Sequence, residues 1–205
     1  ILAMNDRISH APPDEQHPMM NLMGVAKYAF LFLLGFAIQF AFAAQTVDIE
    51  RSEISFGFQQ QGVPGVGKFN KFSAQATFVP TKPETTMARV DIDMTSVDLG
   101  DKGWNQDIQM ASWFATRQFP VSSIVVTGGK MLAPGRYESP GKLTLKGGVH
   151  DVVVSFRSRI EGGALVLEGD VPLKRVPFKV GDGAWADTSV VANEVSVRFK
   201  LAFKK

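Results

Sequence analysis

The sequence predicts an all-β protein, an antiparallel eight-stranded, lipocalin-like barrel with one short amphipathic helix. Apolar residues alternate with polar ones along most of the chain, turn-forming residues separate these stretches, and helical spacing occurs in a single place. Antiparallel strands joined by short turns leave unpaired edges in an open sheet, whereas closure into a barrel removes them. A closed barrel is therefore the architecture that fits a single chain of this size.

The N-terminal part of the chain has the order of features found in a secretory signal. Lys27 precedes an apolar run over 28–44, which contains a small-x-small triplet ending at Ala43. The run falls short of the ~18 to 20 apolar residues of a membrane span, and no basic flank follows it, so a signal is favoured over an anchor. We therefore expect residues 1–43 to comprise an upstream disordered stretch and a signal peptide cleaved after Ala43, and residues 44–205 to form one exported domain.

The first and last segments of that domain show the two-residue period of half-buried strands most clearly. Ile54, Phe56 and Phe58 share one face of the first segment, and the apolar residues of the last alternate from Val195 to Phe203. One face of each strand therefore meets an apolar interior and the other meets water. Similar segments, separated by Gly and Pro turn signals such as those in 62–67, are expected at 72–78, 90–94, 123–126, 143–145, 152–156 and 165–173.

Helical spacing is confined to the segment that begins at Trp104. Trp104, Ile108 and Ala111 fall on one helical face, and Trp113 and Phe114 follow just beyond it. A short amphipathic helix is therefore expected to lie against the barrel.

Composition narrows the classes of function. The chain carries a formal charge of +2, and its Lys and Arg residues are scattered rather than gathered into a concentrated basic surface, so no nucleic-acid partner is expected. The absence of Cys excludes disulfides, thiol nucleophiles and thiolate metal sites. The 16 Phe against 2 Tyr favour an apolar interior. Such an interior fits a solid core and a ligand cavity equally well.

The sequence offers little material for catalysis or metal binding. His150, the one His after residue 43, stands beside Asp151 in a glycine-rich stretch, where a polar turn is a better interpretation than an acid–base pair. Asp91 and Asp93 fall on the expected outer face of a strand and are interpreted as solvated charges. The glycine-rich segment 62–67 lacks the Gly-Lys-Ser/Thr ending of a phosphate loop and precedes a strand. No catalytic residue, metal site or cofactor is therefore predicted.

Six segments in sequence order resemble the YceI-like family of exported lipid-binding proteins. None of them is specific alone, but together they cover the chain from about Val47 to Phe203. The segments are VDIERSEISFGF, GKFNKFSAQATF, DIDMTSVDLG, WNQDIQMASWFATRQFP, GKLTLKGGVHDVVVSF and LEGDVPLKRVPFKVGDG. The resemblance implies an extended lipocalin-like barrel in the periplasm, whose long internal pocket takes a polyisoprenoid chain such as a polyprenyl phosphate or a quinone tail.

This resemblance shifts the balance between core and cavity toward a cavity. It implies binding, transport or storage of an isoprenoid lipid without covalent chemistry or a cofactor, with transient membrane contact and a homodimer as further options. The polar head is expected at the mouth, held by Gln59, Lys68 or Asn105. The residues expected to contact the ligand are Ile54, Phe56, Phe58, Gln60, Phe69, Phe72, Trp104, Ile108, Trp113, Phe114, Leu143, Leu145, Phe156 and Phe199.

The chain departs from the family pattern near the expected ligand path. Gln60 stands where the family often has His, and Trp104 and Asn105 stand where it has an Arg-Asp pair, so the family's head-group preference does not carry over. One alternative is an enzyme or enzyme accessory that acts on a lipid or quinone in the same cavity, which a buried Asp107 beside the head would favour. Another is a filled barrel that acts through surface contacts.

Overall fold

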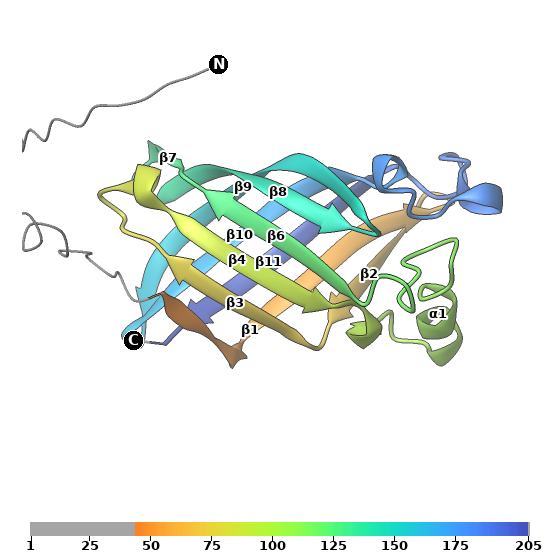
Figure 1. The fold of residues 1–205 in the computed structure, drawn as a ribbon, viewed down its shortest axis with the longest axis horizontal. Helices are drawn as coiled ribbons and strands as arrows, with labels where there is room; N and C mark the ends of the chain where they lie inside the picture. Colours follow the sequence, from red (N-terminus) through yellow and green to blue (C-terminus); the bar gives the residue numbers. More distant parts are fainter. Residues whose placement is uncertain (1–43, 205) are drawn as a thin grey trace, which may run out of the picture. The chain divides into compact units, whose positions relative to one another are not determined.

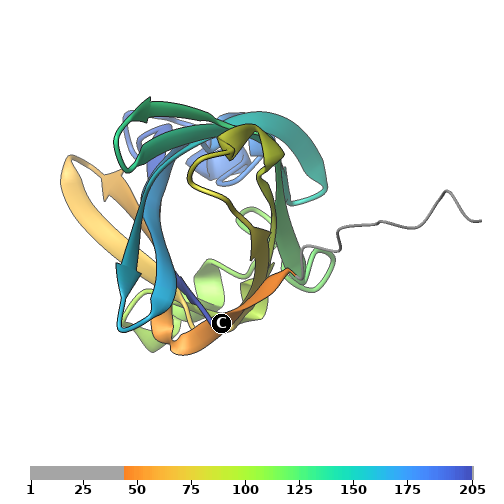
Figure 2. The ribbon, with the colours of Figure 1, turned by 90° about the vertical axis from the view of Figure 1, so that its left-hand side faces the viewer.

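The computed structural model describes residues 44–204, so the expected signal peptide and its cleavage site lie outside the described residues. Eight antiparallel strands form a closed barrel, as predicted (Figure 1 and Figure 2). The pairing of the last strand in the circuit with β1 closes the barrel. In order of pairing, the circuit consists of β1 (Gln45–Gln60), β3 (Phe72–Thr77), β4 (Met87–Asp93), β6 (Val121–Thr127), β8 (Arg136–Leu145), β9 (Gly148–Glu161), β10 (Ala164–Lys174) and β11 (Glu194–Phe203).

The alternation in the sequence places apolar side chains on the inner face of these strands. In β1, Ile54 and Phe56 are buried, whereas Glu53, the residue before Ile54, is exposed to solvent. Each segment predicted to be a strand overlaps one strand of the circuit, and β6 and β9 extend beyond the predicted bounds at both ends. The barrel interior is therefore the apolar face that the two-residue period predicted.

The segment predicted as a glycine-rich turn is instead largely a strand. The turn is confined to Gln61 and Gly62, and β2 (Val63–Phe69) pairs with the C-terminal half of β1. On its other side, β2 pairs with β5 (Val97–Asp98) through its last two residues, so most of that side is an edge. An edge strand tolerates a proline, which explains Pro64.

The predicted helix lies at the end of the barrel next to β2 (Figure 1). It is α1 (Lys102–Asp107), and the Asp101 carboxylate caps it by accepting a hydrogen bond from the Trp104 N–H at 3.0 Å. The helix ends sooner than the spacing of apolar residues suggested. Trp113 and Phe114 lie in turns, which end at Ala115 in a left-handed conformation with a φ of 50°.

A second irregular segment, between β10 and β11, lies at the same end. It contains the short 3-10 helices η3 (Val176–Phe178) and η4 (Gly183–Trp185). The backbone N–H groups of Gly181 and Asp182 donate to the Ser112 carbonyl at 2.8 and 2.9 Å, which joins it to the segment after α1. We call this end of the barrel the open end, because the interior reaches solvent there. At the opposite end, β7 (Lys130–Ala133) forms a hairpin with β8.

No helix among residues 44–204 is both long enough and apolar enough to cross a bilayer.

Candidate functional site

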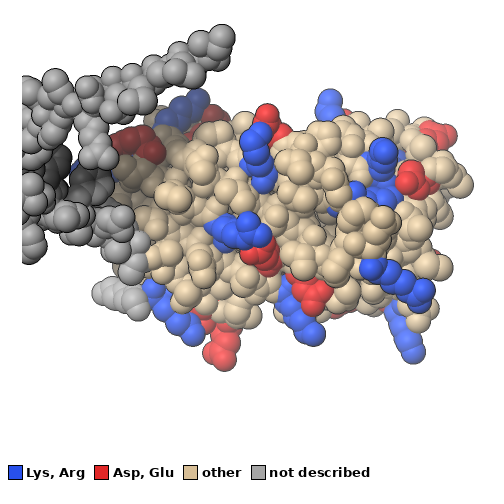
Figure 3. Space-filling model, in the orientation of Figure 1, with Lys and Arg blue, Asp and Glu red and all other residues tan. Residues whose placement is uncertain are grey.

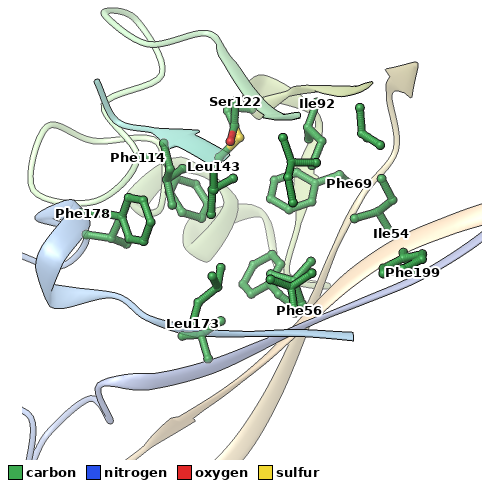
Figure 4. A pocket seen from close by; sticks show the side chains of 18 of the residues that line it. Ile54, Phe56, Phe69, Ile92, Phe114, Ser122, Leu143, Leu173, Phe178 and Phe199 are labelled. Atoms are coloured by element: carbon green, nitrogen blue, oxygen red, sulfur yellow. The ribbon is translucent and has the colours of Figure 1, made fainter. Parts of the chain in front are cut away.

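A cavity of about 310 Å³ lies inside the barrel. Inward-facing side chains of the barrel strands form most of its wall, and the segments that carry α1 and η4 complete it. In Figure 4, Phe114 and Leu143 lie on one side of this space, Phe69 lies on another, and Phe56 and Leu173 lie below them. The volume falls at the lower end of the ~300 to 1,000 Å³ typical of ligand sites.

Two hydroxyl groups in the wall are already satisfied by the chain itself. Ser122 Oγ donates to the Thr144 carbonyl at 2.8 Å, and Thr86 Oγ1 donates to the Pro83 carbonyl at 2.6 Å. Both residues are buried. Since a bonded hydroxyl offers little to a ligand, the interior favours an apolar occupant.

The cavity reaches solvent at the end that carries α1 and η4. Four of its wall residues are exposed there: Gln60, Trp104, Asp107 and Trp185. Two further exposed wall residues, Gln75 in β3 and Lys174 in β10, stand between inward-facing neighbours, so their side chains point away from the barrel. We therefore take this end as the mouth of the cavity.

The opposite end, which we call the closed end, is filled by an aromatic cluster. The Phe78 ring lies 4.9 Å from Tyr137 and 5.5 Å from Phe156, measured between ring centroids, with edge-to-face geometry. The Tyr137 hydroxyl donates to the Pro80 carbonyl at 3.4 Å. Edge-to-face aromatic packing excludes water well, so this cluster seals the barrel.

A second group of phenylalanines lines the cavity toward the open end. Phe56 lies 5.3 Å from Phe69, 6.1 Å from Phe58 and 6.2 Å from Phe114, between ring centroids. All four of these rings contribute to the cavity wall, whereas Phe156 is the one member of the closed-end cluster that does. The four rings form an apolar surface against which a chain can lie.

Arg175 organises the segment between β10 and β11, and sequence reasoning missed it. Its side chain is 4% exposed and lines the cavity. Burial lowers the pKa of its guanidinium, yet arginine keeps its charge in proteins. The five N–H groups donate to backbone carbonyl oxygens of Ala192 at 3.1 Å, Val180 at 2.9 Å, Gly181 at 2.8 Å, Trp185 at 2.8 Å and Val191 at 2.7 Å.

The strand period contained a signal for this residue. Val171 and Leu173 line the cavity from β10, and Arg175 follows at the same spacing of two. A charged residue at an inward position of an apolar strand predicts a buried polar contact.

Lys146 ties the β8–β9 turn to the same segment. Its side chain is 8% exposed, and its Nζ donates to the Lys179 carbonyl at 2.6 Å and to the Asp182 carboxylate at 3.1 Å. The mouth is thus bordered by a segment that polar contacts hold in place from two sides.

The structure brings together almost all of the residues predicted to contact a ligand. Every one of them lines the cavity except Phe72, and their contact with a ligand stays a prediction. Phe72 is partly buried beside a separate shallow depression that it shares with Asp91 and Val121. It is the first residue of β3 and lies opposite Ile92 of β4, which borders both the cavity and this depression.

Two of the side chains expected to hold a polar head, those of Lys68 and Asn105, are engaged elsewhere. Lys68 pairs with Asp98 at 3.7 Å, and the Asn105 side chain binds both the Leu99 N–H and Asp98. The Gln59 carbonyl accepts from the Ala192 N–H. None of Gln59, Lys68 and Asn105 lines the cavity, whereas Lys174 and Trp185, which were not predicted, do.

The groups considered for catalysis are at the surface. Asp107 lines the mouth but is exposed, so it lacks the burial that the enzymatic alternative required. His150 is exposed as well, and its ring lies 4.5 Å from that of Phe178. Among the residues that the structure describes, no three His, Asp or Glu side chains gather in a way that could hold a metal ion.

Charges on the outside are mixed. Figure 3 shows Lys and Arg side chains interspersed with Asp and Glu on one face of the barrel. Several are paired on neighbouring strands, such as Lys142 with Asp151 at 2.7 Å and Lys130 with Glu138 at 3.0 Å.

Solved structures share this fold. The crystal structure of BcnA from Burkholderia cenocepacia is 38% identical, with a TM-score of 0.74, over 76% of this chain and 98% of that one. A polyisoprenoid binding domain from Saccharophagus degradans, implicated in plant cell wall breakdown, is 18% identical, with a TM-score of 0.64, over 78% of this chain and 98% of that one. At that identity, the second likeness supports the fold alone.

Sequence comparisons agree with the structural ones. A UPF0312 protein of Azotobacter vinelandii is 27% identical over 96 residues, which are 47% of this chain and about half, 50%, of that relative. The family model of the YceI-like domain matches residues 45–203, which is nearly the whole described barrel. The chain therefore belongs to the YceI-like family.

Proposed function

We propose that the barrel binds a long isoprenoid lipid of the polyprenyl phosphate or quinone type, for transport or storage in the periplasm after export. The apolar chain occupies the cavity and the polar head stays at the mouth, near Gln60, Trp104 and Asp107. No bond is made or broken. Transient contact of the mouth with a membrane supplies and removes the lipid.

The observation that carries this proposal is a lengthwise cavity with an apolar wall and bonded hydroxyls. Each buried methylene contributes roughly 0.8 kcal/mol, so a five-carbon unit contributes up to about 4 kcal/mol before ordering costs. A few units therefore suffice for tight binding. The chain belongs to the YceI-like family and shares its barrel fold with a domain described as polyisoprenoid binding.

The experiment measures lipid bound to the purified full chain by native mass spectrometry, followed by extraction and identification of the lipid. The matched variants are Ile124→Trp and Val125→Trp on β6. Ile124 lines the cavity, whereas its neighbour Val125 is 38% exposed on the outer face. We expect an isoprenoid lipid on the parent protein, loss of that lipid in Ile124→Trp, and retention in Val125→Trp.

Equal occupancy in both variants would place the lipid outside the cavity and overturn the proposal. A parent protein that folds but takes up no isoprenoid lipid would overturn it as well. Intrinsic fluorescence gives an independent readout, because Trp104, Trp113 and Trp185 all line the cavity. For the location, N-terminal sequencing of the protein from the periplasmic fraction should begin at Ala44.

A further inference from the structure

Two glycines of β2 explain how large aromatic residues can line this cavity without filling it. In the register of β1 with β2, Gly67 lies opposite Phe56 and Gly65 lies opposite Phe58. Directly opposed residues on neighbouring strands share one face of the sheet. Both glycines therefore belong to the inner wall, beneath the two phenylalanine rings.

The rings occupy the space that a side chain at either glycine would need. A Cβ atom on Gly65 would lie 2.4 Å from Phe58 Cζ, 2.7 Å from its Cε2 and 2.9 Å from its Cε1. A Cβ atom on Gly67 would lie 2.4 Å from Phe56 Cζ, 2.6 Å from its Cε1 and 2.7 Å from Leu99 Cδ2. Each ring thus lies flat against the backbone of β2.

Neither glycine is needed for its backbone conformation. Neither residue has a φ in the left-handed region, so alanine would be accepted by the main chain. Glycine inside a strand weakens it and often marks a close approach by another group. Here the approaching groups are the rings of Phe56 and Phe58.

A methyl group at either position would drive the ring toward the lumen. Carbon atoms pack at ~3.5 to 4.0 Å, so each ring would have to retreat by roughly 1 Å or more from the wall. Sideways movement of Phe56 is blocked by Phe69, at 5.3 Å, and Phe114, at 6.2 Å between ring centroids. The remaining direction is into a cavity of about 310 Å³.

We infer that Gly65 and Gly67 set the bore of the cavity near its mouth and thereby determine which chains it admits. This inference rests on the proposed function. A chain with methyl branches is wider than a straight one, so a bore kept open by glycine admits an isoprenoid, and a narrower bore rejects it first. The two glycines are specificity-determining residues that do not themselves contact the polar head of a ligand.

The test compares two alcohols of equal backbone length, geranylgeraniol with methyl branches and palmitoleyl alcohol without them, bound to the purified full chain. The variants are Gly65→Ala and Gly67→Ala. The matched control is Gly57→Ala in β1, where a Cβ would meet nothing within 4 Å. We expect Gly65→Ala to lose about tenfold in affinity for geranylgeraniol, the scale of one misplaced methylene, and to keep its affinity for the straight chain.

A second variant separates a narrowed bore from a general defect. Combining Gly65→Ala with Phe58→Ala removes the displaced ring, so Gly65→Ala should cause no further loss of geranylgeraniol binding when it is introduced into Phe58→Ala. If Gly67→Ala fails to fold, because it also meets Leu99, Gly65→Ala and this double variant still decide the question. A parent protein that binds neither alcohol would overturn the proposed function. A parent that binds both, with unchanged selectivity in Gly65→Ala or the same tenfold loss when Gly65→Ala is added to Phe58→Ala, would overturn this inference alone.

Discussion

The two ends of the barrel are held together by different forces. At the closed end, Phe78 packs edge to face against Tyr137 and Phe156, which stack on each other, and the stability of this cluster comes from dispersion and the exclusion of water. At the open end, a buried guanidinium gathers five backbone carbonyls of a segment without strands.

Because of this difference, the mouth can open to a ligand while the rest of the barrel stays folded. Side-chain packing in a core is lost or kept as a whole, whereas a segment held by hydrogen bonds to one residue can open locally while the strands stay paired. A sealed end and a locally held mouth let the barrel exchange a ligand without unfolding. The following substitutions test this contrast, beginning with the largest expected effect.

Arg175→Met should have the largest effect on the open end. It leaves buried carbonyls without a donor, and each costs ~1 to 3 kcal/mol. We expect about 5 kcal/mol less free energy for opening residues 176–192, measured by amide hydrogen exchange. Arg175→Lys has fewer donors in a different geometry, so its free energy for opening this segment should lie between those of the parent protein and Arg175→Met. Equal loss of protection in β8 and β9 would show that the two ends are not independent.

Phe78→Ala should destabilise the closed end without affecting the ligand. A packed core phenylalanine costs ~3 to 5 kcal/mol when truncated, and Phe78 does not line the cavity. Chemical denaturation should therefore show this loss in the free energy of unfolding, while lipid occupancy per folded molecule stays the same. A parallel loss of lipid would mean that the cavity extends through the aromatic cluster.

Phe58→Ala should affect lipid retention more than stability, which is the reverse of Phe78→Ala. Phe58 is partly buried and borders empty space, so we expect a loss of unfolding free energy below ~3 kcal/mol, the lower limit for a packed phenylalanine. Retention of the isoprenoid should weaken more than stability does, because the ring supplies apolar contact. Melting and lipid occupancy measured on the same samples check this. A loss as large as that of Phe78→Ala, with no effect on lipid, would indicate a solid core here.

Acid should loosen the start of α1, with the smallest effect of the series. Asp98 Oδ1 accepts from the Gly100 N–H at 2.9 Å and from Asn105 Nδ2 at 3.2 Å, and these bonds hold the pKa of Asp98 below its ordinary value. Because the pKa is lowered in the folded state, the Asp98 carboxylate stabilises the fold fully above the ordinary carboxyl pKa, ~3.9. This stabilisation is lost as the pH falls through the lowered value. The protection factors of the Leu99 and Gly100 amides, which are corrected for the intrinsic pH dependence of exchange, should therefore fall in acid.

Asp98→Asn is the control for this pH effect. Its amide oxygen does not titrate, so exchange at Leu99 and Gly100 should lose its additional acid dependence. The same acid dependence in Asp98→Asn would assign the effect to another group.

The strand period predicted most of the barrel and most of the cavity wall, because both follow from which side chains point inward. Phe56, Phe58 and Phe199 needed no tertiary information beyond the alternation of their strands. The segment 62–67 was misjudged as a turn, since glycine and proline mark turns locally. Here Gly65 and Gly67 occur in β2 because β1 places two phenylalanine rings over them, and Pro64 is tolerated because β2 is an edge strand.

The details of the mouth could not be predicted, because they depend on contacts between distant segments. Arg175 carried a signal in its spacing from Leu173, but its partners are carbonyl groups, which every residue type supplies. Lys68 and Asn105 were reasonable choices for a polar head, yet they form contacts around Asp98 instead.

The anchor at Arg175 also bears on how this protein can change. Because the guanidinium binds carbonyl oxygens, it places no requirement on the side chains of Val180, Trp185, Val191 or Ala192. Val180 and Val191 are still constrained because they are buried, but an exposed position such as Trp185 can be substituted while the path of the main chain around the mouth is preserved. The rim can thus be diversified, in nature or in a library, to suit new head groups on an unchanged barrel.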